Sequence, residues 1–308
     1  MADITAWISS FRLKTLPLSI SGIITGTFIA LSEGFFDWKI FILALITTLF
    51  LQILSNLAND YGDGVKGTDE GRLGSKRAVQ SGEISASKML KAVIVLALLS
   101  FVAGTALLWV SFGKEYIVQL LIFLFLGLSA IAAAMKYTIG KNPYGYAGFG
   151  DLFVFIFFGI VSVMGTYFLY SKNMKWDVLL PAVSIGLLSV GVLNLNNLRD
   201  YTTDLRSKKN TIVVKVGVGN AKLYHELLTM FAFVAAIIYS SLNYFGLVQA
   251  IFLFLIIPVI AHVRRVVNNN NPKDLEPELK KLALITLGFS VLFGLGLYLS
   301  TLEYFKFY

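Results

Sequence analysis

Nine apolar runs, each of about 20 residues, constrain the fold of this chain more than any other feature of its sequence. They lie near residues 15–33, 39–59, 90–110, 117–136, 151–170, 178–199, 223–243, 246–264 and 281–301. Runs of this length are typical of helices that cross a bilayer, whereas strands of a membrane barrel alternate apolar and polar residues over about ten positions. The sequence therefore predicts an all-α, polytopic membrane protein with nine transmembrane helices.

The composition agrees with this fold class. Hydrophobic residues make up 56% of the 308 residues and charged residues only 14%, with a mean hydropathy of +0.74. Cysteine is absent, which excludes disulfides, thiolate metal sites and cysteine nucleophiles. The first apolar run follows "WISSFRLKTLP" and has no small-residue cleavage site behind it, so we expect this span to remain in the mature protein.

The basic residues are divided unequally between the two sides of the predicted bundle. The N-terminal end and the loops after even-numbered spans hold 21 of the 26 lysines and arginines. The other side holds Lys39, Lys114, Lys172, Lys175 and Lys306. Because cytoplasmic loops are enriched in Lys and Arg, we expect a cytoplasmic N-terminus. The net charge of +8 then reflects topology. It predicts no nucleic-acid partner, while contact with membrane lipid or a phosphorylated substrate stays open.

Two clusters of polar side chains follow spans 39–59 and 178–199, in the segments "SNLANDYGD" and "LNLNNLRDYTTD". If each helix continues past the hydrocarbon, three of these side chains share one helical face. They are Asn56, Asp60 and Asp63 in the first cluster and Asn196, Asp200 and Asp204 in the second. Asp60 and Asp200 are 140 residues and four spans apart, which suggests a weak internal repeat of spans 1–4 and 5–8, followed by span 9. We treat residues 1–308 as one domain.

An ordinary solvated loop would explain one such cluster, because Asp and Asn are common in caps and turns. Two clusters of this kind favour a bound cation. A carboxylate at a helix C-terminus costs about 0.3–1 kcal/mol against the helix dipole, and like charges one turn apart repel. Polar clusters at a membrane boundary are also costly and usually functional.

The chemistry of these side chains indicates magnesium and a diphosphate. Carboxylate oxygens without His or Cys suit Mg²⁺, which prefers one or two carboxylates, water and a substrate phosphate. Basic residues beside the clusters are suited to phosphate binding; they are Arg72, Lys76, Arg77, Arg199, Arg206, Lys208 and Lys209. A diphosphate at the face of an apolar bundle suggests a polyprenyl diphosphate, whose C–O bond ionises. Loop aromatics Tyr137, Tyr144, Tyr146 and Phe149 are candidates to stabilise the cation.

Several long motifs carry a resemblance to a known family. They are "RLKTLPLSISGIITG", "NLANDYGDGVKGTD", "RAVQSGEIS", "NPYGYAGFGDLFVFIFFG", "NLNNLRDYTTD" and "NTIVVKVG". With these motifs the chain resembles the UbiA superfamily of intramembrane aromatic prenyltransferases. Within it, the chain looks most like the menaquinone-pathway branch, which acts on 1,4-dihydroxy-2-naphthoate.

The resemblance implies nine helices around a central cavity and Mg²⁺-dependent transfer of a polyprenyl group to 1,4-dihydroxy-2-naphthoate, with loss of CO₂. It also implies a bacterial cytoplasmic membrane protein with its active site facing the cytoplasm. The implied metal ligands are Asn56, Asn59, Asp60, Asp63, Asp200 and Asp204, with the four aspartates as the catalytic set. The candidate contacts to diphosphate or acceptor are Arg12, Lys14, Arg72, Arg77, Lys141, Tyr144, Asn196, Arg199 and Lys209.

Two other functions stay open from the sequence. The first is the same transfer to 4-hydroxybenzoate or another aromatic acceptor. The second is a divalent-cation transporter, which is disfavoured because the acidic clusters share one side of the membrane. We interpret Asp69 as a loop-ordering residue and leave the role of Asp151 open. The segment 265–280 is expected to be a plain solvated linker, and His225 and His262 to serve packing.

Overall fold

The computed structural model describes residues 4–68 and 77–304, and every regular element in these two ranges is a helix. The first half contains α1 (Ile4–Phe11), η1 (Leu13–Thr15), α2 (Leu16–Ser32), α3 (Trp38–Lys66), α4 (Ala86–Phe112), α5 (Ile117–Lys136), η2 (Tyr144–Tyr146) and α6 (Gly150–Val154). The second contains η3 (Phe155–Met164), α7 (Gly165–Ser171), η4 (Trp176–Val178), α8 (Leu179–Arg199), α9 (Tyr201–Arg206), α10 (Ile212–Leu242), η5 (Leu247–Leu255), α11 (Ile256–Val267), η6 (Pro272–Asp274) and α12 (Leu275–Tyr304).

The prediction of nine membrane-spanning helices is confirmed for the described residues. The predicted limits of the fourth span, 117–136, coincide with α5, and most other limits differ by a few residues. Three spans begin about ten residues before the predicted runs, at Ile4, Ile212 and Pro272. The expectation of a solvated linker over 265–280 is therefore wrong, since residues 268–271 alone separate α11 from η6.

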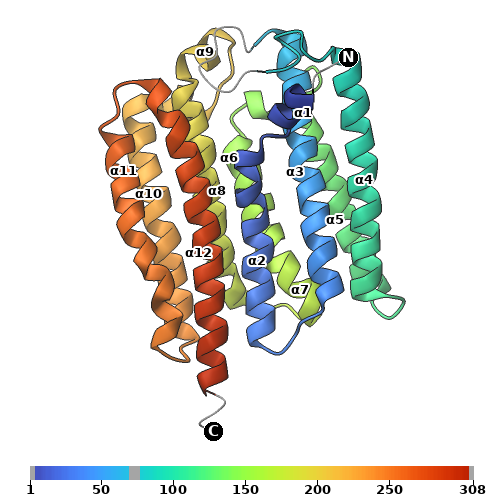
Figure 1. The fold of residues 1–308 in the computed structure, drawn as a ribbon, viewed down its shortest axis with the longest axis vertical. Helices are drawn as coiled ribbons and strands as arrows, with labels where there is room; N and C mark the ends of the chain where they lie inside the picture. The colour runs from blue at the N-terminus through green and yellow to red at the C-terminus, as the bar shows by residue number, and fades with distance from the viewer. Residues whose placement is uncertain (1–3, 69–76, 305–308) are drawn as a thin grey trace.

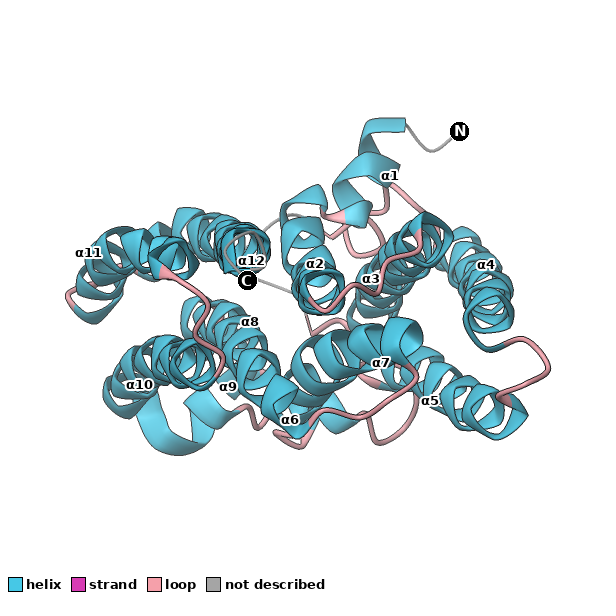
Figure 2. Cartoon of the chain, turned by 90° about the horizontal axis from the view of Figure 1, so that it is seen from below, coloured by secondary structure: helices cyan, strands magenta, loops and turns pink. Residues whose placement is uncertain are grey.

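The spans form one bundle with its long axis along the helices (Figure 1). The start of α1 and the end of α12 lie at opposite ends of this bundle, as an odd number of spans requires. Seen along the axis, α10, α11 and α12 gather with α8 on one side and α4 and α5 lie on the other (Figure 2). The buried apolar side chains form two clusters. The larger joins α2, α7, α8, α10, α11 and α12 and reaches the first turns of α3 and the last turns of α4, and the smaller joins α1, the rest of α3 and the first turns of α4.

Glycines on α2 allow the helices at the centre of the bundle to approach closely. A Cβ added at Gly26 would lie 2.5 Å from the carbonyl oxygen of Val163, and one at Gly22 would lie 2.2 Å from Ser162 Oγ. Small residues at membrane helix contacts permit such short distances between backbones. The partner segment η3 is a π-helix, a conformation that is frequent at functional sites.

The two acidic clusters sit at helix ends of different construction. Helix α3 continues to Lys66, so Asn56, Asp60 and Asp63 lie on one helix as predicted, and all three are buried. Helix α8 instead ends at Arg199, and Asp200 has non-helical angles (φ −93°, ψ 8°) before α9 begins. The expected continuous helix is thus broken at Asp200.

Candidate active site

Asp63 stands at the centre of the polar end of the bundle. Its Oδ1 accepts a hydrogen bond of 2.8 Å from the Tyr146 hydroxyl, and its Oδ2 accepts one of 3.3 Å from Arg77 Nη2. Both Asp63 and Arg77 are almost completely buried, at 3% and 6% exposure. The carboxylate is therefore held between an ion pair with Arg77 and a hydrogen bond from Tyr146.

Asp60, on the same helix, has mainly backbone partners. Its two oxygens accept hydrogen bonds from the backbone N–H groups of Ala78 (3.1 Å) and Val79 (3.0 Å), and Ser10 Oγ adds a third at 3.4 Å. The side chain is 1% exposed and does not line a described cavity. In this structure Asp60 fixes the segment that carries Arg77.

Asn56 and Asn59 both line the main cavity. Asn56 Nδ2 donates to the carbonyl oxygen of Phe11 (2.9 Å) and to Thr15 Oγ1 (3.1 Å), which fixes the N-terminal segment against α3. Asn59 Oδ1 accepts from Thr138 Oγ1 at 3.3 Å. Gly62 permits this contact, since a Cβ there would lie 2.5 Å from the same hydroxyl.

The N-terminal segment turns over the mouth of the cavity at Arg12. This residue has left-handed angles (φ 51°, ψ 59°) between α1 and η1, a conformation that costs a non-glycine residue about 1–2 kcal/mol. The turn places Arg12 and Lys14 on the cavity lining. Backbone strain of this kind is frequent where a structure positions functional side chains.

The second cluster is organised around Arg199, which is 2% exposed. Its Nε and Nη2 donate to the two oxygens of Asp200 at 2.8 and 2.7 Å, and Nη2 also donates to Asn196 Oδ1 at 2.6 Å. Its Nη1 pairs with Glu276 at the start of α12, and the other oxygen of Glu276 pairs with Lys14. One guanidinium therefore joins the end of α8 to α12.

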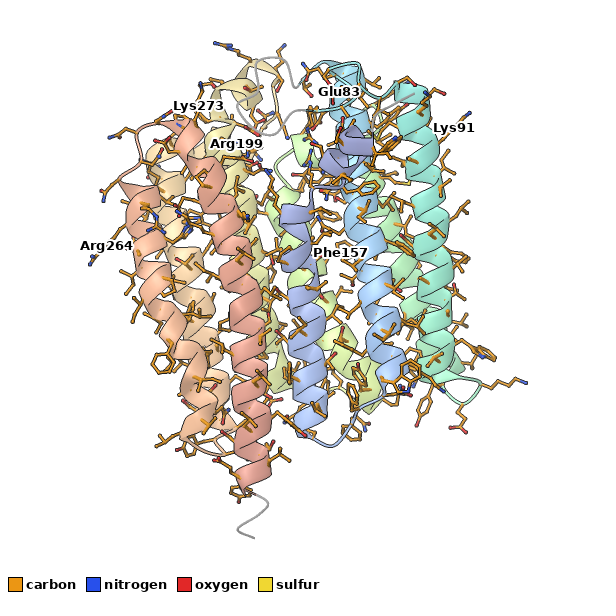
Figure 3. The ribbon with its side chains drawn as sticks, in the orientation of Figure 1. Glu83, Lys91, Phe157, Arg199, Arg264 and Lys273 are labelled. Atoms are coloured by element: carbon orange, nitrogen blue, oxygen red, sulfur yellow. The ribbon has the colours of Figure 1, made fainter. Side chains whose placement is uncertain are left out.

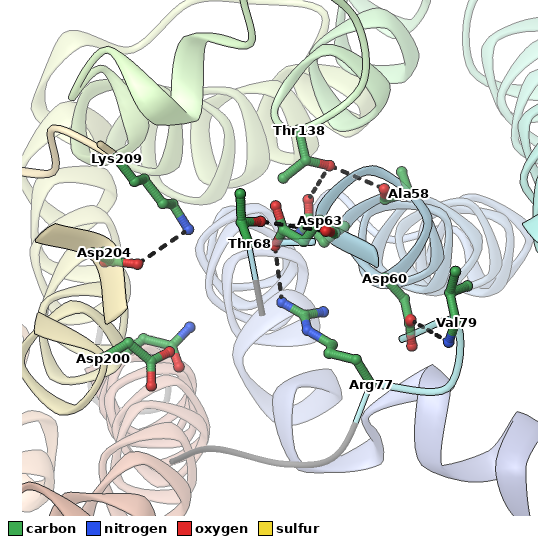
Figure 4. Close-up of polar contacts among 12 residues, drawn as sticks. Ala58, Asp60, Asp63, Thr68, Arg77, Val79, Thr138, Asp200, Asp204 and Lys209 are labelled. Carbon is green, nitrogen blue, oxygen red and sulfur yellow. Dashed lines mark hydrogen bonds and ion pairs between the residues drawn. The ribbon is translucent and has the colours of Figure 1, made fainter. Parts of the chain in front are cut away.

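The two clusters face each other across a narrow gap (Figure 4). Asp63, Asp200, Asp204 and Lys209 all line a small cavity of about 10 Å³ between them. Lys209 Nζ lies 3.9 Å from Asp204 Oδ1. The structure thus brings together three of the four predicted aspartates, Asp63, Asp200 and Asp204, and gives Asp60 a position beside them.

The small cavity adjoins a large one of about 390 Å³ that runs into the bundle, because Asp63, Asp200 and Lys209 line both. Basic and amide side chains line its polar end; they are Arg12, Lys14, Arg77, Arg199, Lys209, Lys280, Gln52, Asn56, Asn59, Asn196 and Asn197. Apolar and aromatic side chains line the rest, among them Leu18, Ala44, Leu107 and Phe157. Arg199 lies near one end of the bundle and Phe157 deeper within it (Figure 3). The cavity therefore combines an anion-binding mouth with a hydrocarbon interior.

Aromatic rings stand where the polar end meets the apolar walls. Tyr144 stacks on Phe153 with ring centroids 4.0 Å apart, and Tyr137 packs edge-on against Tyr144 at 5.3 Å. The Tyr144 hydroxyl donates to the carbonyl oxygen of Ala133 at 2.9 Å. Burial raises the pKa of the Tyr144 phenol above its ordinary value, and Tyr137 adds to the shift. Tyr144 consequently stays neutral at physiological pH.

Some predicted residues lie elsewhere. Lys141 is exposed in the loop after α5 and does not line either cavity. Asp151 is buried and accepts a hydrogen bond of 3.1 Å from the Tyr224 hydroxyl of α10, on the outside of the cavity wall. Arg72 and Asp69 lie outside the described residues.

The UbiA prenyltransferase family matches residues 19–285 of this chain, well over half of its length. The chain belongs to the UbiA prenyltransferase family. This UbiA protein is 41% identical over 296 residues to 1,4-dihydroxy-2-naphthoate octaprenyltransferase of Escherichia coli (strain K12), with 96% of each chain covered. The family resemblance predicted from the motifs is therefore confirmed.

Solved structures of UbiA homologues share the fold. A homologue from Aeropyrum pernix K1 matches with a TM-score of 0.69 at 16% identity, covering 94% of this chain and 98% of that one. A homologue from Archaeoglobus fulgidus bound to GPP and Mg²⁺ matches with a TM-score of 0.64 at 14% identity, covering 95% and 99%. At these identities the likeness concerns the helical architecture.

The donor set of this UbiA chain fits magnesium. Within residues 4–68 and 77–304, no three carboxylate, imidazole or thiol side chains are grouped closely enough to hold an ion unaided. Mg²⁺ suits such an arrangement, because it retains several waters and takes ligands from a substrate phosphate. The carboxylates that line the small cavity are those of Asp63, Asp200 and Asp204.

Sequence reasoning missed Glu276 and gave Tyr146 a different role. Of the four loop aromatics proposed to stabilise the cation, Tyr137 and Tyr144 line the large cavity, whereas Tyr146 and Phe149 line neither cavity and Tyr146 instead donates a hydrogen bond to Asp63. Glu276 pairs with Lys14 and Arg199, although it lies in the segment interpreted as a linker. The position of Glu276 in the first turn of a helix was a usable signal, because acidic residues favour that position.

Proposed function

We propose that this protein is a Mg²⁺-dependent prenyltransferase that moves a polyprenyl group from polyprenyl diphosphate to 1,4-dihydroxy-2-naphthoate. Diphosphate and CO₂ are the other products, and the prenylated product is demethylmenaquinol. The observation that carries this proposal is the pair of facing acidic clusters at the mouth of a long apolar cavity. A diphosphate with a hydrocarbon tail matches both halves of that cavity.

The chain's own residues have separate tasks in this proposal. Asp63, Asp200 and Asp204, with Asn59 nearby, would hold Mg²⁺, which offsets the negative charge that develops on the leaving diphosphate. Arg12, Lys14, Arg77, Arg199 and Lys209 line the cavity mouth and bind the diphosphate oxygens. Asp60 contributes indirectly, by fixing the backbone beside Arg77.

The rings beyond the mouth protect the reacting carbon. Tyr137, Tyr144, Phe153 and Phe157 line the cavity where a C–O bond next to the diphosphate would break. Their faces stabilise a positive charge, and their packing excludes water that would compete with the acceptor. The new C–C bond forms at the carbon that bears the acceptor carboxylate, and that carboxylate leaves as CO₂ while its bonding electrons return to the ring.

The acceptor is proposed from the name of the Escherichia coli relative, to which this chain is 41% identical over nearly its whole length. An acceptor with a carboxylate also suits a mouth lined with arginines and lysines. The rival acceptor, 4-hydroxybenzoate, also carries a carboxylate. The two acceptors are therefore distinguished by comparing their rates of prenylation in the same assay.

The location and internal symmetry are part of the same proposal. The unequal division of basic residues supports a bacterial cytoplasmic membrane protein with its N-terminus and cavity mouth facing the cytoplasm. The matching positions of the clusters at the ends of α3 and α8 support a repeat of spans 1–4 and 5–8.

An assay with purified protein tests the proposal. The protein in detergent is incubated with Mg²⁺, a polyprenyl diphosphate and labelled 1,4-dihydroxy-2-naphthoate or 4-hydroxybenzoate. We expect a prenylated naphthalene product with release of CO₂, and no product after chelation by EDTA. Absence of this product with prenyl diphosphates of several lengths would refute the proposal, and faster turnover of 4-hydroxybenzoate would reassign the acceptor.

A further inference from the structure

Tyr146 lies where three segments of the chain meet. Its hydroxyl donates to Asp63 Oδ1 at the end of α3 (2.8 Å) and lies 2.7 Å from Thr68 Oγ1. Its backbone oxygen accepts a hydrogen bond of 2.9 Å from the N–H of Asn210, in the segment after α9. The residue therefore connects the regions that carry the first and second acidic clusters.

Two lysines lie over the ring of Tyr146. Lys66 Nζ is 4.7 Å from the ring centroid and Lys209 Nζ is 5.5 Å from it. Both distances allow cation–π attraction. Lys209 also approaches Asp204, with 3.9 Å between Nζ and Oδ1. A path of contacts thus runs from Asp63 through Tyr146 and Lys209 to Asp204.

Tyr146 itself does not line either of the two cavities. A direct contact with substrate is therefore not its role in this geometry. Its contacts are to a carboxylate placed for the metal and to a lysine placed for the diphosphate.

We propose that Tyr146 is a positioning residue that couples the two acidic clusters, holding Asp63 for the metal and Lys209 for the diphosphate. This inference rests on the proposed function and adds a residue to it. Hydrogen bonds to ligating carboxylates orient them, and their loss commonly weakens metal binding about 10- to 100-fold. Arg77 contacts the other oxygen of Asp63, so without the tyrosine hydroxyl the carboxylate is drawn toward Arg77.

The ring makes a separate contribution through Lys209. A lysine carries its charge on a flexible four-carbon stem, so an unsupported ammonium occupies many positions. The face of Tyr146 restricts Lys209 to the space beside Asp204. Removing the hydroxyl should consequently weaken metal binding, and removing the ring should weaken binding of the prenyl diphosphate.

Three variants separate these contributions. Tyr146→Phe removes the hydroxyl and keeps the ring, Tyr146→Leu removes both, and Tyr61→Phe is the matched control on α3. Mn²⁺ binding is measured by electron paramagnetic resonance on the detergent-purified full chain with inorganic diphosphate. The Michaelis constants for Mg²⁺ and the prenyl diphosphate are measured in parallel.

We expect Tyr146→Phe to bind Mn²⁺ about tenfold more weakly and to need correspondingly more Mg²⁺, with little change in kcat at saturation. Tyr146→Leu should also raise KM for the prenyl diphosphate about threefold or more. Mn²⁺ affinity within about twofold of the parent for both variants would overturn the inference. If the parent shows no prenyl transfer but Tyr146→Phe still weakens Mn²⁺ binding, the proposed function fails and the coupling stands.

Discussion

Asp60 and Asp63 lie one turn apart on α3, and their carboxylates have different partners. Asp63 lines both cavities and pairs with Arg77 and Tyr146. Asp60 is turned to the backbone N–H groups of Ala78 and Val79. The two aspartates therefore have different roles. Asp63 faces the cavities, and Asp60 fixes the backbone of the segment that carries Arg77.

Asparagine substitutions distinguish these two uses. Asp63→Asn removes a charge placed for the metal, and we expect prenyl transfer to fall about 100-fold and Mn²⁺ to bind at least about tenfold more weakly. It also leaves the buried Arg77 without its ion pair, so the free energy of unfolding falls as well. Asp60→Asn leaves one acceptor oxygen for two N–H donors, so we expect the unfolding free energy to fall by about 1–3 kcal/mol. Equal losses of Mn²⁺ affinity in the two variants, measured by electron paramagnetic resonance in detergent, would contradict this division.

Arg199 supplies a planar fork that lysine cannot reproduce. Arg199→Lys loses the two parallel hydrogen bonds to Asp200, so we expect inorganic diphosphate to bind about tenfold more weakly or worse. Isothermal titration calorimetry measures the affinity. Arg206→Lys is the control, because Arg206 is exposed at the end of α9, and it should match the parent.

Glu276 pairs with two cations that line the mouth of the large cavity. It pairs with Lys14 and Arg199, and a bound diphosphate would displace its carboxylate from them. Glu276→Gln should therefore bind inorganic diphosphate about threefold to fivefold more tightly, a modest gain because the Lys14 and Glu276 side chains are each about one-third exposed. Glu226→Gln, on the exposed face of α10, is the control. Weaker binding by Glu276→Gln would show instead that this carboxylate positions the two cations.

The sequence predicted the spans and the acidic clusters because both depend on local patterns. Hydrocarbon length defines a membrane helix, and helical spacing places Asn56, Asp60 and Asp63 on one face. The partners of those side chains depend on packing between distant segments. Asp60 meets Ala78 across a loop, and Glu276 meets Arg199 from a helix 77 residues away. No periodicity encodes such contacts, and for the same reason His225 and His262 gave no signal.

His225 and His262 form a buried hydrogen-bonded pair that the sequence did not indicate. Their Nε2 atoms lie 3.0 Å apart, and His262 Nδ1 lies 2.6 Å from Glu278, which also accepts from Arg265 and Lys281. His262→Leu should lower the unfolding free energy by about 1–3 kcal/mol, because it leaves His225 and Glu278 without this partner.

The double variant His225→Leu/His262→Leu tests the same network. Replacing His225 as well removes one of the two groups that His262→Leu leaves without this partner, so the double variant should be more stable than His262→Leu alone. Neither histidine lines a described cavity, so KM for the prenyl diphosphate should stay close to that of the parent in both variants. A large change in KM would connect this network to the site.

The absence of cysteine makes the proposed orientation directly measurable. Lys114 and Asn270 are exposed in connections at opposite ends of the bundle, the first between α4 and α5 and the second between α11 and η6 (Figure 1). With the cavity mouth facing the cytoplasm, a membrane-impermeant maleimide should label Lys114→Cys in bacteria with a permeabilised outer membrane. Asn270→Cys should react only after the inner membrane is broken. Asn270 lies at the same end as Arg199, so labelling of Asn270→Cys before lysis would place the site on the outer face and reverse the orientation inferred from the lysines and arginines.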